Sequence, residues 1–238
     1  MPAVLNYEKL KESDEENRYS FEADYPQIAP AESSTASEIN LLIEAFVTHE
    51  LQRFRSHAVE RMAVKSKEPK LPPHPNLNWD DLYISHEVSL FNDDVLSLEF
   101  HLTSYYAFAA HPNHQTRTLN FRLRPTPLSL ELDDLFQSNS NYLVFISEYC
   151  IRALQEQLPQ QMKEMYSNAK DSWIGRGAGP QQRNFEKFLL TKEGLRIIFD
   201  EYQVGSYAEG RREVVIPIAA IAPMLKQPFV ELASPRTE

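Results

Sequence analysis

Several residue types that support common chemistries are scarce in this chain of 238 residues. Cys150 is the single cysteine, so the chain forms no internal disulfide, and no CxxC pair exists to hold zinc or to exchange thiols. There are only 6 glycines, whereas Tyr and Phe are plentiful, with 11 and 13. This composition is typical of a packed globular protein and unlike that of a low-complexity segment.

Long apolar runs are also missing. No stretch approaches the length that spans a bilayer, and the first twenty residues, MPAVLNYEKLKESDEENRYS, contain neither a basic leader nor an apolar h-region. We therefore expect a soluble chain without a transmembrane segment or a visible signal peptide. Whether a leader precedes Met1 is left open.

The excess of basic residues that a nucleic-acid surface requires is lacking as well. The 34 acidic residues outnumber the 24 Lys and Arg residues, which gives a formal net charge of -10 and a pI near 5.3. We therefore expect no nucleic-acid partner, because phosphate binding calls for clustered Lys and Arg. A basic partner would suit this acidic chain better.

The first third of the chain predicts a tail, a strand and a long helix. Residues 1–17 are polar and charge-dense and are expected to be a mobile tail. The alternation in RYSFEADYP is typical of a half-buried strand. Thr35 and Glu38 have the spacing of a capping box, and the apolar residues that follow recur at helical intervals, which predicts a helix from about 35 to 64. The proline-rich segment KSKEPKLPPHPNLNWDD then predicts a long crossing loop.

Strands are predicted to dominate the middle of the chain. LYISHEVSLF and VLSLEFHLTSYYA flank the turn-prone triplet Asn92-Asp93-Asp94, so they predict a hairpin. The tetrad His111-Pro112-Asn113-His114 comes next, before a further strand, TRTLNFRL. PTPLSLELDDLF then indicates a short turn or helical piece.

The second half predicts one more helix and three more strands. Asn139 or Ser140 can cap a helix that breaks near residue 158, after which a helical stripe continues to Trp173. WIGRGAGPQQ is expected to be a loop, KFLLTKEGLRIIFDEYQ two strands, and RREVVIPIAAIAPML a strand that turns at Pro217 into a short helix. The class is therefore α+β, with a largely antiparallel sheet of consecutive hairpins packed against two long helices.

The known catalytic signatures are incomplete in this sequence. HELQR at 49–53 lacks the second His of a zinc-protease motif, and His49 and His57 are expected on the solvent side of the long helix. GRGAG at 175–179 follows a helix instead of a strand, so it indicates a connector and not a phosphate loop. Cys150 is expected to be a small buried hydrophobe. Three acidic doublets are expected to cap backbone N–H groups in turns and at helix starts: Asp80-Asp81, Asp93-Asp94 and Asp133-Asp134.

The tetrad is the strongest of the remaining candidates. His111 and His114 have the spacing of two metal ligands, but no obvious third ligand stands beside them, and Pro112 favours an extended loop. The leading interpretation is a loop whose His and Asn side chains bond to backbone. A metal-assisted hydrolase centred on these two histidines is the alternative. We expect no catalytic residue, no metal and no cofactor.

A family resemblance covers about residues 18–226. It is carried by the alanine-rich AAHP loop, a strand with an Asn-Phe pair, LELDDLF and a helix, and FLLTKEGLRIIFDEYQVGSYAEGRREVVIPIAAI. With ADYPQIAPAESSTASEINLLIEAF upstream, this order resembles the tandem domains of unknown function that are shared by the lysozyme-sensing anti-sigma-V factor RsiV and the peptidoglycan deacetylase PdaC. Phe108, Ala109 and Ala110 stand where that family usually has glycines before the AHP element. On this resemblance we expect an N-terminal subdomain at 18–115, a C-terminal subdomain at 116–227 and a tail at 228–238.

The resemblance implies an exported, non-enzymatic binding or sensing module at the bacterial cell envelope, whose partner is a lysozyme-like protein or a cell-wall glycan such as peptidoglycan. Deacetylase chemistry in PdaC-like proteins belongs to a separate domain. Aromatic and histidine side chains on loops are the expected partner contacts, and these are Tyr105, Tyr106, His111, His114, Tyr202 and Tyr207. A structural dimer joined at the exposed edge of the 82–105 hairpin is a further alternative.

Overall fold

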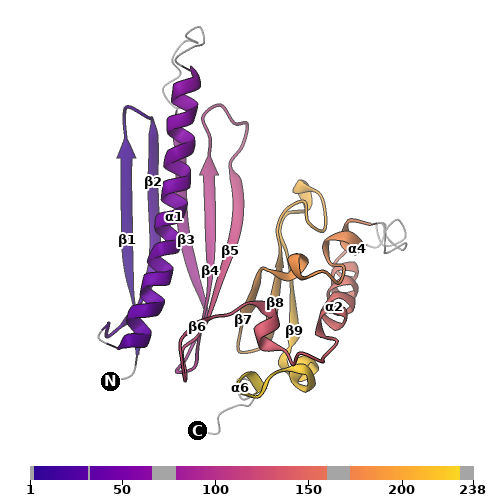
Figure 1. Cartoon of the computed structure of the whole chain (residues 1–238). Coiled ribbons are helices and arrows are strands. Elements are labelled where there is room, and N and C mark those ends of the chain that lie inside the picture. Colours follow the sequence, from indigo (N-terminus) through magenta and orange to yellow (C-terminus); the bar gives the residue numbers. More distant parts are fainter. Residues whose placement is uncertain (1–2, 32, 66–78, 160–171, 231–238) are drawn as a thin grey trace. The chain divides into compact units, whose positions relative to one another are not determined.

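The computed structural model describes residues 3–31, 33–65, 79–159 and 172–230. It confirms the α+β class, with two sheets in which antiparallel pairs dominate (Figure 1). The chain divides into two compact units: unit 1 comprises residues 1–87, 99–117 and 123–127, and unit 2 comprises 88–98, 118–122 and 128–238. This division differs from the expected boundary after residue 115, because three strands contribute residues to both units.

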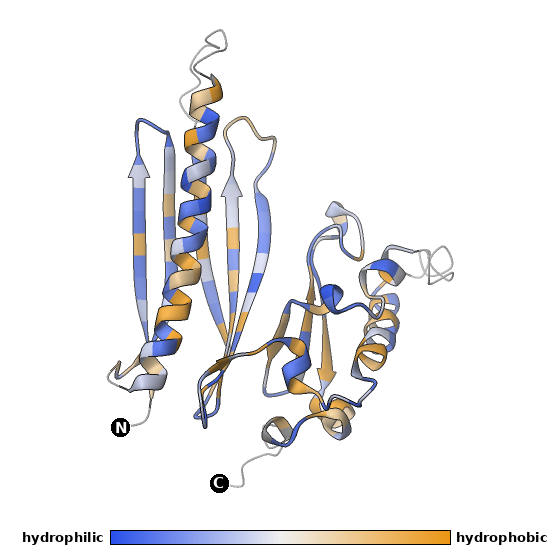
Figure 2. Cartoon of the chain, viewed as in Figure 1, coloured by the Kyte–Doolittle hydropathy of each residue, from blue (hydrophilic) through white to orange (hydrophobic). Residues whose placement is uncertain are grey.

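The N-terminal residues are a strand and not the mobile tail that their charge suggested. β1 (Val4–Asp14) pairs antiparallel with β2 (Tyr19–Ala29) along its whole length. β1 is the first strand of the sheet, and its residues are mostly hydrophilic (Figure 2). Charged residues are a common device on such edge strands because they oppose pairing with another chain. The polar composition therefore indicated an edge strand instead of disorder.

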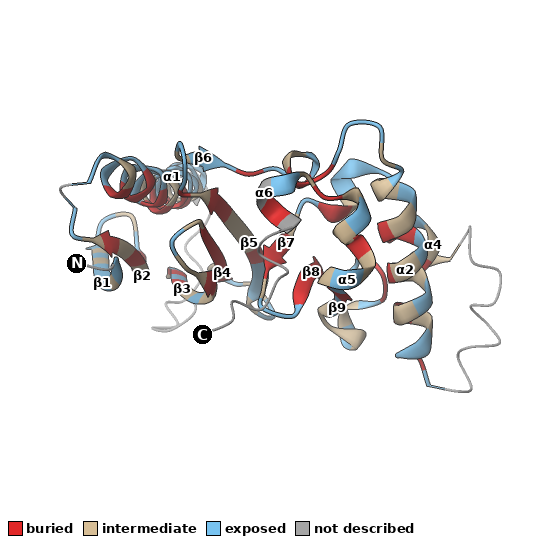
Figure 3. Ribbon diagram, turned by 90° about the horizontal axis from the view of Figure 1, so that it is seen from below, coloured by how far each residue is buried: buried red, intermediate tan, exposed pale blue. Residues whose placement is uncertain are grey.

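The long helix α1 (Ser34–Lys65) matches its predicted bounds and covers one face of the unit 1 sheet. Its buried residues lie on the side that faces the strands (Figure 3). Asn40 ties the two layers together, because its side chain bonds both the N–H and the C=O of Ile28 on β2 at 2.7 and 2.9 Å. Ser33 caps the helix through the N–H of Ala36, so the capping residue precedes the predicted Thr35.

The hairpin predicted around Asn92 is confirmed as β3 (Asp80–Phe91) and β4 (Val95–Tyr105). β3 pairs parallel with β2, and α1 is part of the connection between them. In the six-stranded sheet β3 lies between β2 and β4, and β4 lies between β3 and β5 (Asn113–Arg122). Both strands of the hairpin therefore have a neighbouring strand, although β3 pairs with β2 only from Asp80 to Ile84. The dimer joined at the hairpin edge stays an untested alternative. The predicted crossing loop before β3 lies mostly outside the described residues.

Unit 2 contains a three-stranded antiparallel sheet of β7 (Phe188–Leu190), β8 (Gly194–Phe199) and β9 (Arg212–Pro217), as predicted. The second predicted helix is α2 (Tyr142–Glu156), and its predicted continuation at 160–171 lies outside the described residues. The smaller elements of this part of the chain are β6 (Leu128–Ser129), η1 (Leu132–Leu135), α4 (Trp173–Gly177), η2 (Gln182–Phe185), η3 (Tyr207–Glu209), α5 (Ile218–Ile221), η4 (Ala222–Met224) and α6 (Gln227–Val230). α6 begins where a C-terminal tail was expected.

The buried core of unit 2 is mainly apolar and contains a polar network between strands. Ser97 and Asn120 are both buried, and the Ser97 hydroxyl donates to Asn120 Oδ1 at 2.6 Å. Asn120 Nδ2 donates to Phe188 O at 2.9 Å, and the N–H of Leu190 donates to Ser97 Oγ at 3.0 Å. Because buried amides are stable only when they are bonded, this network fixes β7 against the unit 2 parts of β4 and β5.

Among the helices that the structure describes, none is long and apolar enough to span a membrane.

Candidate functional site

Three aromatic side chains gather on the surface of unit 2. The ring centroids of Trp173 and Tyr202 are 6.5 Å apart, and those of Tyr202 and Tyr207 are 5.8 Å apart with an angle of 31° between the ring planes. Tyr202 is 62% exposed, and the other two are half-buried. We call these three residues the aromatic cluster. Both of the unit 2 tyrosines that the sequence nominated as partner contacts belong to it.

The segment that carries Tyr202 is held in place by the side chain of Gln203, which donates to two backbone carbonyls. Gln203 Nε2 donates to Gly177 O at 3.0 Å and to Asn184 O at 2.9 Å. A Cβ added to Gly177 would lie 1.9 Å from Gln203 O, so only glycine allows the two segments to approach this closely. These contacts fix the position of Tyr202 relative to Trp173, which begins α4.

The loop that joins Tyr202 to Tyr207 is also ordered by its own side chains. The Glu209 carboxylate lies over Gly205, where an added Cβ would be 2.0 Å from Glu209 Oε2. The N–H of Glu209 bonds to Ser206 O at 3.0 Å. The cluster is therefore presented by a defined loop, which lowers the entropic cost of binding a ligand.

Tyr202 has a backbone conformation that costs energy. Its φ is +67°, in the left-handed region that L-residues other than Gly, Asn and Asp rarely adopt, at a cost of about 1–2 kcal/mol. Burial does not offset this cost, because the side chain is mostly exposed. Strain of this kind concentrates at functional sites.

GRGAG forms part of α4 and the residues after it, instead of the expected loop. The helix starts at Trp173 because the Ser172 hydroxyl accepts a hydrogen bond from Gly175 N at 3.0 Å. This cap places Trp173 at the beginning of a separate short helix, where the periodic pattern had placed it at the end of a longer one.

The two tyrosines nominated in unit 1 have local structural partners. The Tyr105 hydroxyl donates to Ala109 O at 2.8 Å and so closes the turn after β4. The Tyr106 ring packs edge-on against His57, with centroids 4.6 Å apart, and it lies 6.1 Å from Phe54. Tyr106 also lines a cavity of about 160 Å³ whose polar residues include Glu50 and Gln115.

The turn after Tyr106 has a backbone conformation that favours glycine. Phe108 has φ +71°, the region that favours glycine, and the N–H of Ala109 bonds to Tyr106 O at 2.9 Å. The glycines that the resembled family usually has near this position suit this conformation.

His111 and His114 are both exposed and do not meet a common third ligand among the described residues. His111 Nδ1 lies 2.9 Å from Pro112 O, and His114 Nδ1 lies 3.2 Å from the Thr103 hydroxyl. β5 already begins at Asn113, so the tetrad is half loop and half strand.

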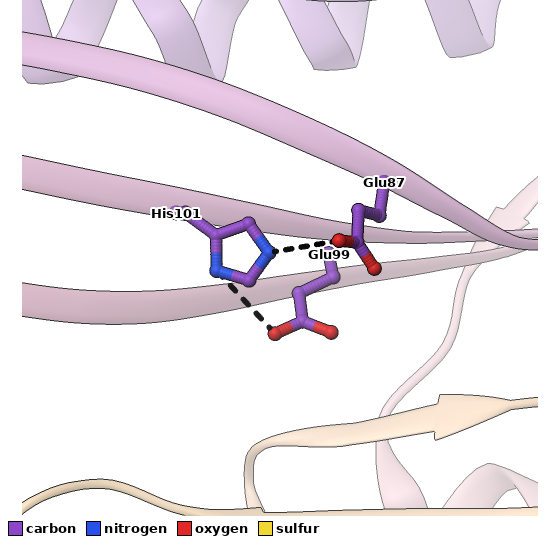
Figure 4. Close-up of side chains that lie close together, drawn as sticks. All are labelled: Glu87, Glu99 and His101. Carbon is purple, nitrogen blue, oxygen red and sulfur yellow. Dashed lines mark ion pairs between the residues drawn. The ribbon is translucent and has the colours of Figure 1, made fainter. Parts of the chain in front are cut away.

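A different set of residues in unit 1 has the composition of a metal site. Glu99 and His101 project from β4 and Glu87 from β3, and each offers one ligand atom within 4.8 Å of the others (Figure 4). His101 Nδ1 is 3.6 Å from Glu99 Oε1, and His101 Nε2 is 3.9 Å from Glu87 Oε1. Glu99 and His101, two residues apart, share one face of β4, and the pairing of β3 with β4 adds Glu87.

His49, His57 and Cys150 occupy the kinds of position that the sequence predicts. His49 and His57 are exposed on α1, as expected. Cys150 is fully buried, and this burial raises the pKa of its thiol to about 12, so it carries no reactive thiolate near neutral pH.

The acidic doublets differ in how they meet the prediction that they cap backbone N–H groups. Asp134 does so, because its Oδ2 accepts from Glu131 N at 2.9 Å. In the hairpin turn that contains Asp93-Asp94, it is Asn92 Oδ1 that accepts from the N–H groups of Asp94 and Val95, both at 2.9 Å. Asp80 instead begins β3 and is fully buried. It accepts from Arg61 Nε and from Ala107 N, both at 2.7 Å.

Comparison with known proteins relates this chain to a family of unknown function. Residues 133–219 match the family described as "Protein of unknown function (DUF3298)". The chain is 21% identical over 183 residues to peptidoglycan-N-acetylmuramic acid deacetylase PdaC from Bacillus subtilis, and the match spans 77% of this chain but only 37% of that protein.

Two solved structures share the fold along nearly the whole chain. A DUF3298 family member from Bacteroides fragilis matches with a TM-score of 0.68 at 17% identity, covering 98% of this chain and 97% of that one. A DUF3298 family protein from Pseudomonas aeruginosa matches with a TM-score of 0.63 at 16% identity, covering 98% of each chain. The matched family segment contains all three residues of the aromatic cluster.

Proposed function

We propose that this DUF3298-containing chain is a non-enzymatic, extracytoplasmic module that binds a cell-wall glycan through the aromatic cluster. The observation that carries this proposal is the preorganised group formed by Trp173, Tyr202 and Tyr207, in which the central Tyr202 is exposed and strained. The left-handed conformation belongs to a turn closed by the hydrogen bond from Gln203 N to Asp200 O at 3.1 Å, and this turn presents the Tyr202 side chain, 62% exposed, at the surface.

Aromatic faces suit glycans for a physical reason. One face of a pyranose ring presents C–H groups, which stack on a flat apolar ring, while the sugar hydroxyls bond to groups at the rim. Trp173 and Tyr207 lie 6.5 and 5.8 Å from the exposed ring of Tyr202, so a sugar that stacks on Tyr202 has further aromatic rings nearby. Tyr202 and Tyr207 also carry hydroxyls that can bond to the ligand.

The likeness to PdaC supports a location at the cell envelope and peptidoglycan as the first ligand to test. Since this chain spans little more than a third of that protein, the deacetylase activity in its name does not transfer with the matched segment. A binding role is consistent with the scarcity of catalytic motifs in the sequence.

A basic protein is the second candidate partner, and the net charge of -10 favours it. The resemblance to a lysozyme-sensing family makes lysozyme the appropriate probe. We favour the glycan because the aromatic cluster is a preorganised feature of the surface, whereas acidic charge is spread along the sequence.

The experiment is a sedimentation assay with insoluble peptidoglycan, combined with calorimetry against lysozyme. We expect the wild-type protein to bind peptidoglycan, and Tyr202→Ala or Tyr207→Ala to weaken binding at least about tenfold, as is usual when an aromatic anchor is truncated. Tyr83→Ala is the matched control, because Tyr83 is an exposed tyrosine of unit 1. Binding of lysozyme alone would replace the glycan with a protein partner, and binding of neither would overturn the proposal.

A further inference from the structure

Glu87, Glu99 and His101 lie on two neighbouring strands of unit 1, away from the aromatic cluster in the chain and in a different unit. We propose that these three residues form a binding site for a divalent transition-metal ion, with Zn²⁺ as the ion to test. The site does not depend on the proposed glycan binding.

The donor set matches the chemistry of such ions. Neutral imidazole suits Zn²⁺, Ni²⁺ and Cu²⁺, whereas Ca²⁺ and Mg²⁺ prefer sites made only of oxygen. Some catalytic zinc sites use the same ligand types in the opposite ratio, two imidazoles and one carboxylate, with bonds of about 2.0–2.2 Å. The histidine therefore sets the preference for a transition metal.

The two carboxylates face different nitrogens of the imidazole, Glu99 the Nδ1 atom and Glu87 the Nε2 atom, so one carboxylate must turn for both to meet an ion on a single nitrogen. Ligand atoms around a zinc ion lie about 3–4 Å apart for bonds of this length, and here the three ligand atoms lie within 4.8 Å of one another. Glu99 and His101 are fixed by their positions two residues apart on β4. The Glu87 side chain is 69% exposed, so it can turn toward the imidazole at little cost (Figure 4).

The charge of the site favours a cation. Glu99 is only 1% exposed, and a buried carboxylate loses most of its hydration. A second carboxylate within 4.8 Å adds repulsion that grows as the surroundings become less polar. A divalent ion between the two carboxylates would oppose their mutual repulsion.

The site is also open to solvent on one side. The His101 side chain is 32% exposed and Glu87 is more so, hence an ion can enter without unfolding of the strands. Three protein ligands leave at least one position of a tetrahedral ion for water or for an oxygen of a ligand.

The test is equilibrium dialysis of the purified, chelator-treated protein against Zn²⁺, Mn²⁺ and Ca²⁺, with the retained metal measured by mass spectrometry. We expect one Zn²⁺ per chain, with weaker retention of Mn²⁺ and none of Ca²⁺. His101→Ala and Glu87→Gln should each weaken Zn²⁺ binding at least about tenfold, because even the loss of a group behind a ligand costs about 10–100-fold. Glu87 is exposed, so its variant folds even if a change at His101 disturbs the sheet.

His111→Ala and His114→Ala are the matched controls, because both histidines are exposed and stand outside the cluster. They should retain Zn²⁺ as the wild type does. Loss of Zn²⁺ only in these variants would place the ion at the tetrad instead, and no stoichiometric Zn²⁺ in the wild type would show that His101 is merely an imidazole between two carboxylates. Either result overturns the proposed site and leaves the peptidoglycan assay unaffected.

Discussion

The tyrosines nominated as partner contacts have different surroundings in the two units. In unit 1, Tyr105 bonds a carbonyl four residues away, and Tyr106 packs against an imidazole and a phenyl ring. In unit 2, Tyr202 and Tyr207 meet each other and Trp173 at the surface. Tyr202 is 62% exposed whereas Tyr105 and Tyr106 are half-buried, so exposure, and not residue type, distinguishes the side chain that is open to a partner.

The two units also differ in how they use polar groups. Unit 1 joins its helix to its strands with charged pairs, whereas unit 2 joins its strands with a neutral network at Ser97 and Asn120. Substitutions in these two sets should therefore change stability through different mechanisms while leaving the aromatic cluster intact.

The largest effect is expected for Asp80→Ala in unit 1. Asp80 is fully buried, and its removal leaves the Arg61 guanidinium, 12% exposed, without its carboxylate and the N–H of Ala107 without its acceptor. Breaking a buried ion pair of this kind costs about 3–5 kcal/mol. Urea unfolding followed by circular dichroism measures the loss, and peptidoglycan binding of the folded fraction should not change.

The double variant Asp80→Leu with Arg61→Met is the control for this prediction. It removes both charges, so we expect it to recover part of the lost stability. A double variant that is no more stable than Asp80→Ala would show that the N–H of Ala107, and not the charge pair, dominates.

A smaller effect is expected for Asn120→Ala in unit 2. The substitution removes the amide that bonds Phe188 O and the Ser97 hydroxyl, and an unsatisfied buried polar group costs about 1–3 kcal/mol. The same unfolding measurement applies. Asn113→Ala, at an exposed position of the same strand, is the control and should be nearly neutral; equal losses at both positions would contradict the assigned role of the network.

The smallest effect, and the one that depends on pH, is expected for Glu12→Gln on β1. The hydrogen bonds from Arg55 and then from the Tyr19 hydroxyl lower the pKa of the Glu12 carboxyl below its ordinary value of 4.5. A lowered carboxyl pKa stabilises the folded state above about pH 4.5, and this contribution is lost as the pH falls through the folded-state pKa.

We therefore expect Glu12→Gln to cost about 0.5–1 kcal/mol at pH 7, since the pair is partly exposed, and to be nearly neutral at low pH. Thermal unfolding of the wild type and the variant across pH 3–7 measures this difference. Glu8→Gln, at an exposed position of the same strand, should show no such trend. A cost for Glu12→Gln that persists at low pH would mean that packing, and not charge, holds β1.

Local patterns were sufficient for the elements that bury a regular apolar face. The 35–64 periodicity predicts α1 to within one residue at each end, and the hairpin turn at Asn92 is correct. β1 was missed because its pairing with β2, and not apolar composition, makes it a strand.

The candidate sites were predictable only in part, because they depend on contacts between distant segments. Tyr202 and Tyr207 were nominated from their residue type, but the addition of Trp173 depends on the cap at Ser172 and on the glycine that lets Gln203 approach α4. Glu87 joins Glu99 and His101 only through the pairing of β3 with β4.

Peptidoglycan binding by Tyr202→Asn, measured beside its free energy of unfolding, tests the central claim most directly. Asparagine tolerates the left-handed conformation, so the variant should be as stable as the wild type or more stable by up to about 1 kcal/mol. If Tyr202 is strained in order to contact a glycan, binding should fall at least about tenfold while stability is kept. Unchanged binding, or a loss of binding that only follows a loss of stability, would contradict the account.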